Sequence, residues 1–160
     1  MKKIFVLLVA VATMFAQDVF AQKPAQTEEQ KEAAKAKREQ MMQTRLELLK
    51  TELQLSDEQL VKFDPVYRKF RGEIQRVTGA NKEARMKKEQ ITNENALVVV
   101  SSRLSNNILT STVKQRYLLL FADVIEPLQI MKLYQVDEKV SREAHKIMKY
   151  RQQAAQMDKK

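Results

Sequence analysis

Few residues in this chain could carry out chemistry. The 160 residues contain no cysteine and a single histidine, His145, so thiol nucleophiles, thiolate metal sites and paired-histidine zinc sites are excluded. The two glycines, Gly72 and Gly79, stand alone, so the sequence has no glycine-rich loop to hold a phosphate. Carboxylates are present, but their spacing does not pair them in a pocket. We therefore expect a protein that is not an enzyme and that uses no cofactor.

One group of residues could bind a metal ion. His145 has Glu138 and Glu143 nearby in the sequence, and Met41 and Met42 could add soft sulfur ligands. A single histidine on a helix is more often a surface or core residue than a ligand. We therefore assign no metal ligand and treat metal sensing as the weakest of the binding functions considered below.

Basic residues outnumber acidic ones and indicate binding rather than catalysis. The chain has 29 Lys and Arg against 20 Asp and Glu, a net charge of +9. Basic side chains attract an unfolded protein chain over a distance, and salt weakens this attraction. Our candidates for such contacts are Arg68, Lys69, Arg71, Arg76, Lys82, Arg85, Lys87 and Lys88. The alternative is that these charges form a solvated helix face. Nucleic acid is not an expected partner, because the aromatic residues fall on core-facing positions rather than among the basic ones.

The first 21 residues have the pattern of a secretory signal peptide. Two lysines precede an apolar run over 4–15 that is too short to span a bilayer, and small residues allow cleavage after Ala21. A retained membrane anchor is disfavoured because polar residues follow the apolar run directly. We expect a mature single domain over 22–160, located in the periplasm of a Gram-negative bacterium and not stably inserted in a membrane. Because the periplasm holds no ATP, its activity would depend on binding energy alone.

The rest of the chain predicts an all-α protein with four long helices, over 28–54, 57–78, 93–124 and 127–157. Two glycines and three prolines are too few for the turns of a β protein. Helices of about 30 residues are roughly 45 Å long, so we expect an elongated, hairpin-like molecule that covers its remaining apolar surface by forming a homodimer. The polar and basic segment 80–90 is expected to be the most mobile part.

Two helix starts follow the same rule. Ser56 and Gln59 form a capping box, and Leu55 precedes it as half of a hydrophobic staple. Seventy residues later, Pro127 occupies the favoured first position of a helix, with an apolar residue before it and a glutamine after it. Segments 55–70 and 125–140 therefore form a degenerate internal repeat. The motif residues are Leu55, Ser56, Gln59, Ile125, Pro127 and Gln129.

The motif Leu55-Ser56-Asp57-Glu58-Gln59, in a secreted, basic, all-helical chain, resembles the LTXXQ-motif family of periplasmic proteins, the Spy/CpxP-like proteins. The second copy keeps only the apolar first position, Ile125, and Gln129. The resemblance implies four helices in a hairpin-like chain that pairs into a thin, curved, antiparallel dimer. It also implies that the motif residues are structural, because they set where helices begin.

The resemblance and the charge together favour one function over two others. We expect an ATP-independent periplasmic chaperone, or envelope-stress protein, that binds unfolded or misfolded clients. The alternative is a sensor or regulator of envelope-stress signalling that binds a membrane sensor kinase or acts in an ECF sigma factor pathway. A metal-responsive sensor is the third possibility.

Overall fold

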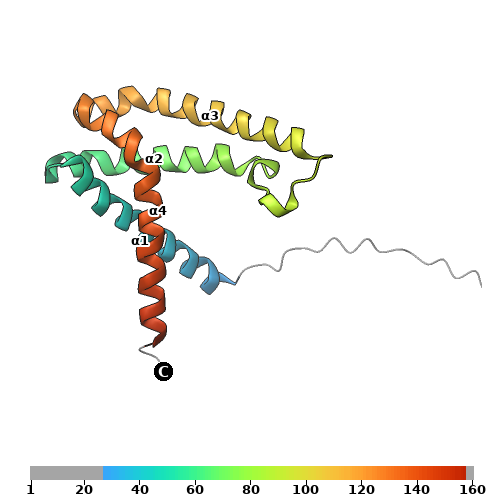
Figure 1. The fold of residues 1–160 in the computed structure, drawn as a ribbon. Coiled ribbons are helices and arrows are strands. Elements are labelled where there is room, and N and C mark those ends of the chain that lie inside the picture. Colours follow the sequence, from blue (N-terminus) through green and yellow to red (C-terminus); the bar gives the residue numbers. More distant parts are fainter. Residues whose placement is uncertain (1–26, 158–160) are drawn as a thin grey trace, which may run out of the picture.

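The computed structural model describes residues 27–157 and is all-α, as predicted (Figure 1). Its four long helices are α1 (Glu28–Leu53), α2 (Asp57–Gly79), α3 (Ala96–Ala122) and α4 (Pro127–Met157), and two short 3-10 helices, η1 (Glu83–Arg85) and η2 (Lys88–Gln90), lie between α2 and α3. The predicted signal peptide, 1–21, lies outside the described residues. Within the described range, no helix has both the length and the apolar character that crossing a membrane requires.

The helix ends confirm the capping rules. Ser56 Oγ accepts a hydrogen bond from the Gln59 backbone N–H at 3.1 Å, and Gln59 Oε1 accepts one from the Ser56 N–H at 3.0 Å. Pro127 is the first residue of α4, and Gln129 Oε1 accepts from the Glu126 N–H at 2.9 Å. The largest error is at α3, which begins three residues later than predicted, because residues 92–95 form a turn.

The helices pair in a symmetrical pattern. α1 packs mainly against α4, and α2 packs mainly against α3, while consecutive helices α1 and α2, or α3 and α4, touch mainly near the turn that joins them. In Figure 1, α2 and α3 run side by side as an extended hairpin, and α1 and α4 cross each other away from it. The chain therefore consists of two halves, α1–α2 and α3–α4, in which the first helix of each half packs on the second helix of the other.

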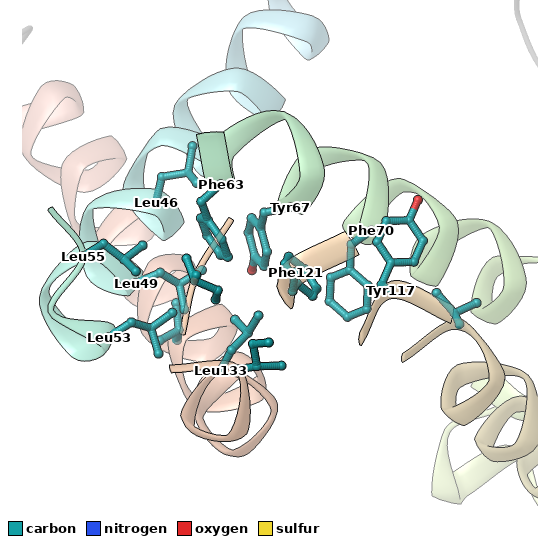
Figure 2. Close-up of a cluster of buried hydrophobic side chains, with 14 residues drawn as sticks. Leu46, Leu49, Leu53, Leu55, Phe63, Tyr67, Phe70, Tyr117, Phe121 and Leu133 are labelled. Atoms are coloured by element: carbon teal, nitrogen blue, oxygen red, sulfur yellow. The ribbon is translucent and has the colours of Figure 1, made fainter. Parts of the chain in front are cut away.

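The core lies where the four helices meet (Figure 2). Its centre on the α2–α3 side is aromatic: the Phe121 ring lies 5.6 Å from Phe63 and 5.5 Å from Phe70, measured between ring centroids. Its other side is aliphatic and includes Leu49 and Leu133, which are both fully buried. Burial of these side chains supplies most of the folding free energy, at about 25 cal/mol for each Å² of apolar surface.

The third helix does not bury the whole apolar stripe read from its sequence. Val113 and Tyr117 are buried, as a core stripe requires, but Leu104 and Ile108 are 58% and 67% exposed. The apolar pattern changes helix face between Ile108 and Val113, where the interval is five residues rather than three or four. As a result α3 is apolar on its inner face and also on its outer face.

Candidate functional site

The outer face of α3 is the largest exposed apolar surface in the described part of the chain. Nine of the fourteen exposed large hydrophobic side chains lie on this helix. We call them the outer α3 face: Leu97, Val98, Val100, Leu104, Ile108, Leu109, Leu118, Leu119 and Leu120. A group of exposed hydrophobic side chains on one helix often marks a site that binds another polypeptide, so the outer α3 face is a candidate binding surface.

The basic segment lies against the same helix. Arg103 on α3 donates hydrogen bonds from Nε to the Ala84 carbonyl at 3.3 Å and from Nη2 to the Met86 carbonyl at 3.1 Å. Asn81 Nδ2 donates to the Ser102 carbonyl at 3.3 Å. The segment that we expected to be most mobile is therefore tied to α3 at several points. These bonds hold the segment that carries the lysines against the N-terminal half of α3.

Six of the eight basic candidates are available for binding. They are all exposed, and within residues 27–157 none of them forms an ion pair: Lys69, Arg76, Lys82, Arg85, Lys87 and Lys88. Four of the six belong to the segment that α3 holds. The candidate site is therefore a combination of the outer α3 face with these six cations, and we refer to the latter as the basic rim.

The other two candidates hold the fold together instead. Arg68 on α2 forms a two-pronged ion pair with Glu39 on α1, with N–O distances of 2.7 and 2.8 Å, and also pairs with Asp64. The hydrogen bonds from Arg68 lower the pKa of Glu39 to about 2. The Arg71 side chain is only 14% exposed, and its Nη1 lies 2.7 Å from Asp137 Oδ2. We therefore exclude Arg68 and Arg71 from the binding surface.

The partner of Arg71 belongs to a buried polar cluster that we did not predict. The Tyr67 hydroxyl donates to Asp137 Oδ1 at 2.6 Å, so one carboxylate accepts from both a phenol and a guanidinium. Burial, and then the charge of Asp137, raise the pKa of Tyr67 well above its ordinary range. A signal was present in the sequence: Asp137 lies at core spacing between Leu133 and Val140 on α4, where a charged residue needs a buried partner.

The two motif glutamines meet each other. Gln59 Nε2 donates to Gln129 Oε1 at 3.0 Å, and Gln129 Nε2 donates to the Leu53 carbonyl at the end of α1, at 3.1 Å. Each glutamine also caps its own helix. The pair therefore joins the starts of α2 and α4 to the end of α1, which agrees with a structural role for the motif. Leu55 and Ile125, the apolar residues before the two caps, are both buried.

No protein-family model, curated protein or solved structure matches this chain. Its resemblance to the LTXXQ-motif family remains a prediction that rests on the motif and on the order of the helices.

The residues considered for a metal ion are only partly brought together. His145, Met41 and Met42 line one groove, but Glu138 and Glu143 do not, and Glu143 lies 3.4 Å from the Lys146 ammonium. His145 Nδ1 lies 2.7 Å from the Ser141 carbonyl oxygen of its own helix. Across residues 27–157, no three His, Cys, Asp or Glu side chains are grouped so that they could hold a metal.

Proposed function

We propose that this protein binds unfolded or misfolded proteins in the periplasm, without nucleotide, as a chaperone of the envelope. The observation that carries the proposal is the outer α3 face, an exposed apolar surface on the helix that holds the segment with four of the six cations of the basic rim. Such a surface offers apolar contacts to segments that a folded protein hides, and a folded protein with a buried core has little to place on it.

Binding would proceed in two steps that depend on different residues. The basic rim attracts acidic stretches of an unfolded chain and raises the association rate, an effect that falls with ionic strength. The outer α3 face then holds apolar side chains of the client, since burying apolar surface contributes about 25 cal/mol for each Å². Leucine and valine side chains on one straight helix impose little shape, so many sequences would fit.

A homodimer would use the same apolar surface. No other helix in the described range exposes as many large hydrophobic side chains, so two copies that pair would do so along α3. Pairing and client binding would then compete, and the oligomeric state has to be measured in the same samples as client binding. Light scattering after gel filtration provides this measurement.

The test is suppression of aggregation. A denatured protein is diluted into buffer with or without an equal amount of the chain 22–160, at low and at high salt. The double variant Leu104→Ser, Ile108→Ser is compared with Leu128→Ser, Met131→Ser, which removes two exposed apolar side chains from α4 instead. We expect suppression by the wild-type chain and by the α4 variant, weaker suppression at high salt, and at least a fivefold loss in the α3 variant.

Two results would contradict the proposal. One is the absence of suppression at any salt concentration while the chain is monomeric and its outer α3 face is free. The other is an equal loss in the α3 and α4 variants, which would show that general surface hydrophobicity, rather than the outer α3 face, is responsible. A Lys87→Glu, Lys88→Glu variant tests the rim separately and should slow client capture at low salt only.

A further inference from the structure

Arg45 on α1 is a buried cation with no partner. Its residue is only 5% exposed, and among residues 27–157 it makes no hydrogen bond and no ion pair; its Nε is fully buried and unsatisfied. Desolvation, together with the like charge of Arg71, lowers the pKa of Arg45 below its ordinary value. Asp137 is nearby, but it is already occupied by Arg71 and Tyr67. Burying a charge without a partner is costly, so such a group indicates a missing anion.

The Arg45 side chain lines an open groove with a volume of about 400 Å³, within the range of small-molecule sites. The walls come from three helices, α1, α2 and α4. Three of the lining side chains are cations and none is a carboxylate: the full lining is Ala34, Lys37, Arg38, Met41, Met42, Arg45, Gln75 and His145. The groove therefore has an excess of positive charge at its walls and an apolar floor from alanine and methionine.

The equivalent position in the other half of the molecule shows that packing does not require an arginine. Counting back from the last buried residue of each helix, Leu53 in α1 corresponds to Phe121 in α3, and Leu49 corresponds to Tyr117. One turn further back, Arg45 corresponds to Val113, which is 3% exposed and belongs to the core. An apolar side chain thus fills this place in one half, whereas the half that contains the groove has a guanidinium.

We propose that the groove between α1, α2 and α4 binds a carboxylate that carries an apolar tail, with the carboxylate on Arg45 and the tail along Met41, Met42 and Ala34. A guanidinium pairs with a carboxylate through two parallel hydrogen bonds, which would satisfy the free donors of Arg45. Ala34 lies eleven residues before Arg45 on α1, so roughly 16 Å of helix is available for the tail. The ligand is either a free aliphatic acid or the C-terminus of a peptide that ends in apolar residues.

The site shares no residue with the outer α3 face or with the basic rim. Its test therefore does not depend on the proposed chaperone function, and either one can fail without the other.

The experiment is calorimetric titration of the purified protein, as recovered after export, with decanoate below its micellar concentration. Decanol has the same tail without the charge, and acetate has the charge without the tail. N-acetyl-Leu-Leu, as the free acid and as the amide, represents a peptide end. We expect decanoate or the peptide acid to bind with one site per chain, and decanol, acetate and the peptide amide to bind at least tenfold more weakly.

Two variants locate the binding. Arg45→Met should weaken decanoate or peptide-acid binding at least tenfold while leaving the melting temperature equal or higher, because it removes an unpaired buried charge. Arg142→Met removes an exposed arginine from α4, makes the same change in net charge, and should leave binding unchanged. If Arg45→Met fails to fold, Ala34→Phe, which fills the half-buried far end of the groove, should produce the same loss.

Each outcome decides the proposal. If only decanoate binds, the ligand is a free aliphatic acid. If only the peptide acid binds, the ligand is the C-terminus of a peptide. Either result supports the proposed site. The proposal is overturned if neither binds, if decanol binds as tightly as decanoate, or if every correctly folded groove variant binds as wild type does.

Discussion

α1 and α3 occupy equivalent places in the two halves of the molecule, yet their outer surfaces are opposite in character. Each packs its inner face on the second helix of the other half. The exposed residues of α1 are mostly charged or polar, whereas α3 contains no Asp or Glu and exposes nine large hydrophobic side chains. The inner faces are therefore set by the shared fold. The outer faces are not required by the fold, and their difference is the basis of the proposed client-binding surface.

The inner faces of α1 and α3 also differ, because one lies against apolar packing and the other lies beside buried charged groups. The α2–α3 side is filled with aromatic rings, while the side where α1 meets α4 contains the buried cluster of Tyr67, Arg71 and Asp137 with the unpartnered Arg45 beside it. Apolar packing stabilises the first side. On the second side a single carboxylate, Asp137, pairs with Arg71 and lies near the unpaired Arg45.

The largest expected effect comes from the aromatic side. Phe121→Ala removes a ring that lies within 6.2 Å of the rings of Phe63, Phe70, Tyr117 and Tyr134, and should cost about 3–5 kcal/mol of unfolding free energy. Leu53→Ala, the matched change in α1, should cost less because a smaller side chain is lost. Urea denaturation followed by circular dichroism measures both. An equal cost would mean that the two inner faces are energetically alike.

The second-largest expected change in unfolding free energy comes from the buried polar cluster of Tyr67, Arg71 and Asp137. Asp137→Asn removes the ion-pair partner of Arg71 and the one negative charge that acts on Arg45 from nearby, and should cost about 3 kcal/mol. Tyr67→Phe removes only one hydrogen bond and should cost about 1 kcal/mol. Adding Arg45→Met to Asp137→Asn should recover part of the loss, since one of the two uncompensated charges is then gone. If the double variant is no more stable than Asp137→Asn, the charge of Asp137 does not stabilise Arg45.

A smaller effect is expected where the halves meet. Gln59→Ala and Gln129→Ala should each cost about 1 kcal/mol, and the double variant should cost less than the sum, because one shared hydrogen bond is counted in both. A double-mutant cycle in urea gives the interaction energy. Strict additivity would show that the two caps act independently and that the glutamine pair contributes nothing to joining the halves.

The smallest expected effect is on the stability of the protein at low pH. The pKa of Glu39 on α1 is lowered from 4.5 to about 2, chiefly by hydrogen bonds from Arg68. A carboxylate with a lowered pKa in the folded state adds stability above pH 4.5, and this contribution is lost as the pH falls towards 2. Glu39→Gln should therefore flatten the stability curve slightly in this interval, and salt should reduce the difference. A Glu47→Gln variant provides the comparison, because Glu47 is exposed on the same helix and forms no ion pair within residues 27–157.

The sequence predicts the helices of this protein better than their surfaces. The caps at Ser56 and Pro127 act within one turn, so their partners are adjacent in the sequence and the helix starts could be read directly. The pairing of Arg71 with Asp137 joins residues 66 positions apart on different helices, so only the packing reveals it. Leu104 and Ile108 have the spacing of a core stripe and yet are exposed, because periodicity gives the face of a helix but not what covers it.

The packing of α1 on α4 also determines the order in which the molecule can fold. Thr44 on α1 and Met148 on α4 are in contact although they are 104 positions apart, whereas only the segment 80–95 separates α2 from α3. Local contacts form faster than distant ones, so the α2–α3 hairpin would form first and α1 would dock last. During synthesis the N-terminal part of the chain emerges first, so α1 is exposed before α4 is available to cover it. The many charged residues of α1 would keep this helix soluble until α4 is present. A helix with the exposed apolar residues of α3 would be less soluble at the same stage.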